Sequence, residues 1–533
     1  MTGSTEAVIL GLLALTAGLA LLGRKLPVPY PILLVMGGAL LSLVPGLPAV
    51  RLSPELVFFI FLPPLLYPAA LFTPWRDFRA NLRPILLLAI GLVLFTTVVV
   101  GVVAHYLIPG LPLAAGLVLG AIVSPPDAIA AAAIAERLRV PHRIVTILEG
   151  ESLVNDATAL VTYRFAVAAV VTGSMAWHTV SVQFVLVALG GILIGLIIGL
   201  LTAWLQRRID DPPIEITIAL LTPFAAYLLA ERLSLSGVLA VVTAGLHHGW
   251  RIPHITTART RLRAGPVWEM IEFLLNGLIF LLIGLQLPAV VRALSGYSKL
   301  QLLCYAAAIS LAVILVRILW VFPAAYLPRL VFRRLRQRDP YPAWQHLAVI
   351  AWTGMRGVVS LAAALALPLS TQGGAPFPGR DLILLLTFSV ILATLVLQGL
   401  SLPPLLRWLG VEDDRAVEQE ECAARLQANQ AALARLEELG KSEALPPDAL
   451  QRLRAEYEDR IRVLSEACNR ANAGSPRRLF SPVYERLARE TLLVERATLL
   501  RLRNERVIND EVLRRIQRDI DLAEARLWER PAG

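Results

Sequence analysis

Long apolar runs fill most of the first 410 residues of this 533-residue chain. Many of them approach the roughly 20 residues that a helix needs to cross a bilayer. At 56% hydrophobic residues the chain is too apolar for a water-soluble protein of this length. Beyond Glu412 the sequence becomes polar and helix-forming. We therefore predict an all-α polytopic membrane domain over residues 1–410, followed by a helical tail over residues 411–533.

The loops between these runs differ sharply in charge. Loops after odd-numbered runs carry roughly nineteen arginines and lysines, whereas loops after even-numbered runs carry roughly five. The positive-inside rule assigns the arginine-rich loops to the cytoplasm. We therefore expect a multi-pass protein of the inner (plasma) membrane, with its N-terminus outside and its tail in the cytoplasm. The expected spans, about thirteen in number, are residues 6–23, 29–47, 55–72, 84–107, 113–135, 144–170, 181–205, 214–230, 234–248, 268–290, 300–327, 344–367 and 381–408.

Two of the expected spans contain helix-breaking residues. Ser124-Pro125-Pro126-Asp127 interrupts the fifth span, because two prolines cannot both occupy an unbroken helix interior. Thr353-Gly354-Met355-Arg356-Gly357 places two glycines around a charge in the twelfth. Interrupted spans in corresponding places of two halves are typical of transporters built from inverted repeats, whose site lies where the breaks meet. We predict two broken, crossing helices, with spans 4–6 and 11–13 as the two repeats.

The sixth span carries charged residues at membrane depth. A charge at mid-bilayer costs about 2.5–3.5 kcal/mol on insertion scales, and such residues usually mark an ion or proton path. Ser152 and Asp156 are four residues apart and share one helix face, while Glu151 and Asn155 share the adjoining one. A carboxylate with a hydroxyl one turn away suits a small, hard cation, which prefers oxygen ligands. Because the same carboxylate can hold a proton instead, this pattern predicts cation–proton exchange at Asp156.

Other features exclude several classes of function. Most of the net charge of +10 lies in short loops, where topology explains it better than nucleic-acid binding. The chain lacks His-Glu-x-x-His and a recognisable intramembrane protease motif, so we expect a transporter and not an enzyme, without a cofactor. A cation channel stays the alternative from a different class, although a channel would need a filter-like carbonyl run, which the chain lacks. Cys304, Cys422 and Cys468 match neither a disulfide framework nor a metal-site spacing.

The segment Gly150-Glu-Ser-Leu-Val-Asn-Asp-Ala157 resembles the central signature of the monovalent cation:proton antiporters of the sodium/proton exchanger type. Further blocks resemble others of that family in the expected order: Phe61–Tyr67, Gly120–Asp127, Gly277–Leu287 and Gly354–Gly357. The resemblance implies a homodimer in the lipid membrane. Each protomer would have a dimerisation scaffold, roughly residues 6–72 and 181–290, and a moving core, roughly residues 84–170 and 300–408.

The resemblance also implies roles for individual residues of the sixth span. Asp156 matches the aspartate that binds the cation and the proton, and Ser152 matches a neighbouring ligand. Asn155 matches the asparagine that marks electroneutral members. The implied activity is electroneutral one-for-one exchange of Na⁺ for H⁺ by alternating access. A K⁺/H⁺ antiporter with the same machinery stays open, because one sequence does not set cavity size finely enough to separate the two ions.

Three further residues gain roles in the same way. Glu151 and Arg356 match a buried structural ion pair between the two halves of the core. Asp127 matches the aspartate at the crossing of the broken helices; after a helix break it either caps a half-helix N-terminus or contacts the cation directly. Pro126 stands where many relatives have threonine, so main-chain oxygens would have to contribute to the site.

Some residues have no settled role in the sequence. Arg164 either offsets the charge of the site or forms a pair near the outer end of its span, and Arg317 has no assignable partner. His247-His248 fits a pH sensor or an interfacial loop pair without a role. Glu272 is expected at the membrane interface.

Overall fold

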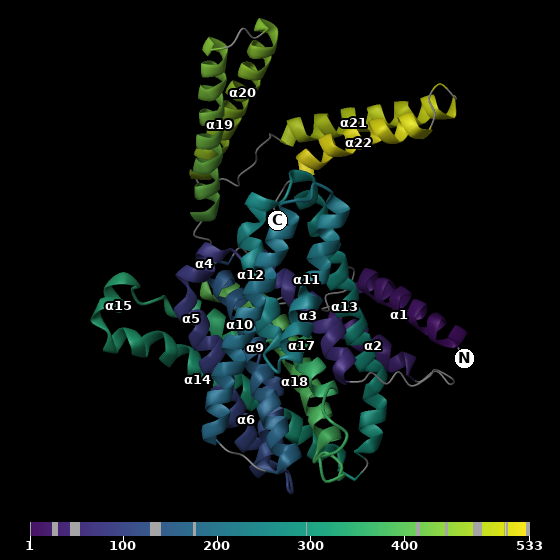
Figure 1. The fold of residues 1–533 in the computed structure, drawn as a ribbon, viewed down its shortest axis with the longest axis vertical. Coiled ribbons are helices and arrows are strands. Elements are labelled where there is room, and N and C mark those ends of the chain that lie inside the picture. The colour runs from purple at the N-terminus through teal and green to yellow at the C-terminus, as the bar shows by residue number, and fades with distance from the viewer. Residues whose placement is uncertain are drawn as a thin grey trace. The chain divides into compact units, whose positions relative to one another are not determined.

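The computed structural model describes residues 2–23, 30–42, 54–127, 140–173, 177–294, 296–411, 416–442, 446–472, 482–505, 507 and 510–528. These residues form helices and short connections, with no β-strand among them. The chain divides into two compact units, Met1–Val411 and Glu412–Gly533. Figure 1 shows the many packed helices of the first unit and the two helical hairpins of the second.

The first unit is a bundle of apolar helices, as its composition predicts. Within the described ranges, seven helices are long and apolar enough to cross a membrane, and shorter apolar helices accompany them. The all-α polytopic class is therefore confirmed, whereas the number of spans stays a prediction. The apolar helices are α1 (Thr2–Gly23), α2 (Tyr30–Leu41), α3 (Pro54–Phe72), α6 (Val93–Leu107), α7 (Leu113–Val123), α9 (His142–Thr172), α10 (Trp177–Gln206), α11 (Pro212–Arg232), α12 (Gly237–Ile255), α13 (Ala258–Ala293), α14 (Lys299–Val331), α16 (Trp344–Trp352), α17 (Val358–Leu365) and α18 (Arg380–Leu409).

Short segments connect several of these helices. The chain enters α6 through a π-helical stretch, η1, which widens the helix locally. Helix α14 begins with a capping box, in which the Ser298 hydroxyl accepts from the Gln301 N–H and the Gln301 side chain accepts from the Ser298 N–H. The short segments are α4 (Trp75–Ala80), α5 (Leu82–Leu86), η1 (Leu87–Leu92) and α15 (Arg333–Arg338).

Helix α7 is buried along nearly its whole length and packs directly on α6. A Cβ atom added at Gly120 would lie only 2.3 Å from the carbonyl oxygen of Thr97. The absence of a side chain there lets the two backbones approach closely, as small residues do between membrane helices. This contact holds the end of α7, and the proline break that follows it, inside the bundle.

Asp339, in the connection after α15, joins two helix ends. Its carboxylate accepts from Arg143 of α9 at 2.9 Å and from Arg329 of α14 at 2.5 Å. Burial alone would raise the pKa of Asp339, but the hydrogen bonds and charges of the two guanidiniums outweigh it and lower the pKa. The folded state therefore favours the ionised carboxylate more than the unfolded chain does.

The variant Asp339→Asn tests this connection. A lowered folded-state pKa contributes stability that is complete above the unfolded value of about 3.9 and is lost as the pH falls through the folded value. We expect a loss of about 1 kcal/mol at pH 7, because the carboxylate is partly exposed. Thermal unfolding at neutral and at strongly acidic pH checks this, and a difference of equal size at both would contradict it.

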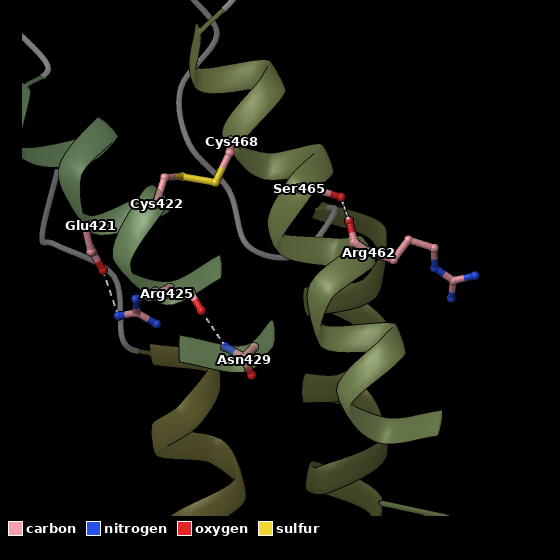
Figure 2. Close-up of a disulfide and its surroundings, with 7 residues drawn as sticks. All are labelled: Glu421, Cys422, Arg425, Asn429, Arg462, Ser465 and Cys468. Carbon is pink, nitrogen blue, oxygen red and sulfur yellow. Dashed lines mark hydrogen bonds and ion pairs between the residues drawn. A yellow bond between two sulfur atoms is a disulfide. The ribbon is translucent and has the colours of Figure 1, made fainter. Parts of the chain in front are cut away.

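The second unit contains helices α19 (Ala416–Ser442), α20 (Pro447–Asn472), α21 (Pro482–Asn504) and α22 (Asp510–Trp528). Helices α19 and α20 pack as one hairpin, and α21 and α22 as another, with Leu499, Leu513 and Ile520 buried between the latter two. Figure 2 shows a disulfide between Cys422 of α19 and Cys468 of α20. The expectation from cysteine spacing was wrong here, because a helical hairpin brings together residues that lie 46 positions apart.

Candidate functional site

Two breaks in the helices meet inside the first unit. Helix α7 ends at Val123 and is followed by non-helical residues 124–127, while residues 353–357 separate α16 from α17. The Asp127 N–H donates to the Met355 carbonyl oxygen at 2.6 Å, which ties one break to the other. Residues 128–139, which hold the rest of the predicted fifth span, lie outside the described residues.

Arg356 fills the space between the breaks. Its side chain is 1% exposed, its Nε donates to the Val123 carbonyl oxygen at 3.0 Å, and a second nitrogen donates to the Gly354 carbonyl oxygen. The guanidinium thus satisfies a carbonyl at the C-terminal end of α7, where a helix dipole favours a cation. Its place at the break is set mainly by backbone carbonyls.

The predicted Glu151–Arg356 ion pair is wrong. Glu151 instead binds Arg317 of α14 through two parallel hydrogen bonds of 2.5 and 2.8 Å. Both side chains are at most 1% exposed, and Arg317 Nε also donates to the Ile350 carbonyl oxygen at 3.0 Å. This fork-to-fork geometry is the strongest form of the pair. The pair joins α9 to α14 and α16, and it supplies the partner that the sequence did not assign to Arg317.

Asp156 lines a cavity of about 360 Å³. Ser152 lies one turn before it on the same wall, and Asp127 contributes from the α7 break. Residues of α3 and α13 complete the lining, with Phe72 at the end of α3. Asp156 is 7% exposed and forms no ion pair with any residue that the structure describes. The Asp156 carboxylate and the Ser152 hydroxyl together offer oxygen ligands suited to a hard cation.

Asn155 is not among the residues that line this cavity. It is fully buried, and its Nδ2 donates to the Pro126 carbonyl oxygen at 3.0 Å. The amide thus holds the first break against α9. The main-chain oxygen of Pro126, expected to contribute to the site in place of a threonine hydroxyl, already accepts this hydrogen bond. Asp156 carries the only titratable side chain of the Asn155–Asp156 pair.

Two polar residues of α13 join the same cavity. Glu272 and Asn276 line it together with residues of α9, so Glu272 does not lie merely at a membrane interface as the sequence suggested. Their spacing of four residues places them on one helix face, next to Gly277 of a block already recognised. That spacing was the feature of the sequence from which a shared position of Glu272 and Asn276 could have been predicted. Glu149 lines the cavity nearer the start of α9.

Other polar residues of open role now have partners. Arg164 binds Glu231 of α11 at 2.5 Å, so it pairs away from Asp156. His248 is buried within α12 and is not part of a loop; its ring nitrogens contact the Tyr67 hydroxyl at 2.5 Å and Gln206 Oε1 at 2.7 Å.

Gly357 sets the position of Asp127. A Cβ atom at Gly357 would lie 1.7 Å from Asp127 Oδ2, so Gly357→Ala must displace the carboxylate or the break. We expect transport to fall about tenfold or more, since errors of about 1 Å in a site have effects of this order or larger. Initial transport rates in vesicles measure the effect. Gly373→Ala is the control, because no atom lies within 4 Å of its added Cβ. Equal rates in both variants would contradict the expectation.

Comparison with known proteins shows which family the chain belongs to. The family model for the transmembrane sodium/hydrogen exchanger matches residues 11–408. The chain belongs to this family. It is 39% identical over 525 residues to an uncharacterized Na(+)/H(+) exchanger of Mycobacterium tuberculosis, covering 98% of this chain and 96% of that protein. It is 38% identical over 407 residues to the sodium, potassium, lithium and rubidium/H(+) antiporter of Bacillus pumilus, covering 74% of this chain and 60% of that protein.

A solved structure supports the fold. The sodium proton antiporter MjNhaP1 of Methanocaldococcus jannaschii matches with a TM-score of 0.59 at 20% identity, covering 74% of this chain and 98% of that one. The predicted family is thus confirmed. Membership of this family, together with the apolar helices, supports a multi-pass membrane protein that exchanges cations for protons.

Proposed function

We propose that this exchanger carries Na⁺ and H⁺ in opposite directions, one for one, with both ions competing for Asp156. The observation that carries the proposal is the free Asp156 carboxylate on the wall of the cavity, beside Ser152 and next to the meeting point of the breaks. Every nearby basic side chain in the described part of the chain has another partner: Arg317 binds Glu151, Arg164 binds Glu231, and Arg356 binds carbonyls. Asp156 is therefore available to a cation.

The carrier step follows from electrostatics. A bare carboxylate in a low-dielectric barrier is costly, whereas a carboxylate neutralised by Na⁺ or H⁺ is not. The loaded site therefore crosses and the empty site does not, which suppresses leak. Because Asn155 does not titrate, one carboxylate handles one positive charge in each direction. The exchanger would then generate no current.

We further propose that the cavity faces the cytoplasm in this conformation. It extends from Asp156 toward Thr73 and Glu149, near the end of α3 and the start of α9, where arginine-rich connections lie. The positive-inside rule places such connections in the cytoplasm. Alternating access would close this route and open one on the opposite side, with the core moving against the scaffold of a homodimer in the inner membrane.

Proteoliposomes test the exchange and its stoichiometry together. Addition of Na⁺ outside vesicles loaded at acidic pH should move protons outward without building a membrane potential. A potential-sensitive dye and a pH-sensitive dye report the two quantities in parallel. A potential that rises with transport refutes the single-charge account, and an unchanged pH gradient refutes antiport. We propose neither an enzymatic activity nor a cofactor.

Potassium transport is the second candidate. The Bacillus pumilus relative is named for sodium, potassium, lithium and rubidium, so a related chain accepts larger cations. Adding each of these cations in turn to the same vesicles ranks their initial rates. A rate with K⁺ above that with Na⁺ would reassign the physiological cation without changing the role of Asp156.

A further inference from the structure

A second cavity, of about 520 Å³, lies between the ends of α3, α11, α12 and α13. It shares Phe72 and Thr73 with the cavity of Asp156 but is lined by none of the proposed ion-binding residues. Its size falls within the range of small-molecule sites in proteins. The proposed exchange mechanism makes no use of it.

Two buried polar groups in this cavity lack protein partners. The two carboxylate oxygens of Glu215 and the indole nitrogen of Trp268 have no hydrogen-bond partner of suitable geometry among the described residues. Both residues are at most 1% exposed. The neighbouring Thr260 hydroxyl stabilises the Glu215 carboxylate electrostatically, but it forms its hydrogen bond of 3.1 Å with the Thr257 hydroxyl. A buried polar group without a hydrogen bond is costly. The Glu215 carboxylate would be satisfied by a donor on a ligand, and the Trp268 N–H by an acceptor on the same ligand.

Hydrogen bonds connect the side chains of one wall of the cavity to the backbone of Glu215. The Tyr67 hydroxyl contacts His248 Nδ1, His248 Nε2 contacts Gln206 Oε1 at 2.7 Å, and Gln206 Nε2 donates to the Glu215 carbonyl oxygen at 3.0 Å. This series of hydrogen bonds ends on the Glu215 backbone carbonyl and does not involve the Glu215 carboxylate. A preformed wall of this kind lowers the entropy cost of binding.

The remaining lining defines the ligand class. Phe72, Trp75 and Trp250 are among the lining residues, and aromatic rings attract organic cations, as the Arg251 guanidinium over the Trp250 ring at 4.8 Å illustrates. Among the described residues, Glu215 is the one acidic side chain in this lining, which offers fewer oxygen ligands to a bare metal ion than the cavity of Asp156 does. A carboxylate, an indole N–H and aromatic faces together suit an organic ammonium group that has an oxygen acceptor beside it.

We propose that this cavity binds a primary ammonium group with an adjacent oxygen acceptor, as in ethanolamine: the ammonium on Glu215, the oxygen on the Trp268 N–H, and the carbon atoms against the aromatic rings. The ligand is either a soluble amino alcohol or the headgroup of an ethanolamine lipid. Arg261, which also lines the cavity, would attract the phosphate of the lipid form.

The test uses the full-length purified protein in two arms. In the first, native mass spectrometry compares retention of phosphatidylethanolamine and phosphatidylglycerol from equimolar mixed micelles. In the second, calorimetry titrates ethanolamine, with ethylene glycol as the uncharged control. Glu215→Gln should weaken binding at least about tenfold, because it removes a charge-assisted hydrogen bond. Trp268→Phe, which keeps a smaller aromatic ring and removes the donor, should weaken binding about three- to tenfold.

Two controls separate this site from others. Asp211→Asn, an exposed acid on the same helix terminus, should bind as the wild type does, and so should Asp156→Asn. Selective retention of the lipid, or saturable binding of ethanolamine, supports the proposal and identifies the source. Absence of binding in both arms, or wild-type affinity in the Trp268→Phe variant, overturns it and leaves the cavity to water. If Glu215→Gln does not fold, the binding affinity of the Trp268→Phe variant tests the proposal.

Discussion

Sodium-driven proton movement falls to the background of empty vesicles when Asp156 is replaced by asparagine: this is the largest effect we expect. Asparagine keeps the shape of the side chain, but it neither titrates nor carries a charge. A cation in the cavity would then lack a compensating charge, a penalty of about 3 kcal/mol for a charge in a membrane interior. This corresponds to a loss on the order of 100-fold or more in affinity.

The measurement is the initial rate of pH-gradient dissipation in proteoliposomes, together with the melting temperature of the same preparation. Because Asp156 forms no ion pair with any described residue, its neutralisation should leave the fold intact. Asp381→Asn is a matched control, since that aspartate is about half exposed at the start of α18, away from the cavity. Retained transport in Asp156→Asn would move the ion site elsewhere.

The second large effect concerns stability. Glu151→Gln removes one partner of a pair that is at most 1% exposed and leaves the Arg317 charge without compensation. Breaking a buried ion pair in this way costs about 3–5 kcal/mol, which is a large share of the stability of a folded protein. We expect a strong decrease in expression and melting temperature. Glu149→Gln, two residues earlier on the same helix, serves as control because Glu149 lines the aqueous cavity.

A double variant separates charge from shape. Glu151→Met with Arg317→Met removes both charges and keeps apolar bulk, so it should recover much of the stability lost in Glu151→Gln. Arg317 also donates to the Ile350 carbonyl oxygen, and because the double variant loses that bond we expect incomplete recovery. If Glu151→Gln melts like the wild type but does not transport, the pair acts directly in transport and not in stability.

The sequence predicted those parts of the site that depend on local spacing. Ser152 and Asp156 fall on one face of α9 because residues four apart do so in any helix, and both line the cavity. The two breaks follow from prolines and glycines, whose backbone preferences act at their own positions. The end of the membrane unit near residue 411 coincides with a change in composition.

Pairs of residues that lie far apart in the chain could not be predicted from sequence spacing. Glu151 had two buried arginines as candidates, and the sequence resemblance favoured the wrong one. The structure decides for Arg317 because α14 brings a guanidinium alongside α9, while the Arg356 side chain is held by the Val123 carbonyl at the break. The disulfide between Cys422 and Cys468 likewise depends on the hairpin of α19 and α20.

The sequence alone therefore determined that the chain is a bundle of membrane helices and that Ser152 and Asp156 share one helix face, because hydrophobic length and helical periodicity are local properties. Only the tertiary structure decided that Glu272 faces the same cavity as Asp156, and that Glu215 and Trp268 share a second one. Such groupings depend on which helix faces pack together, and many packings satisfy the same pattern of apolar runs.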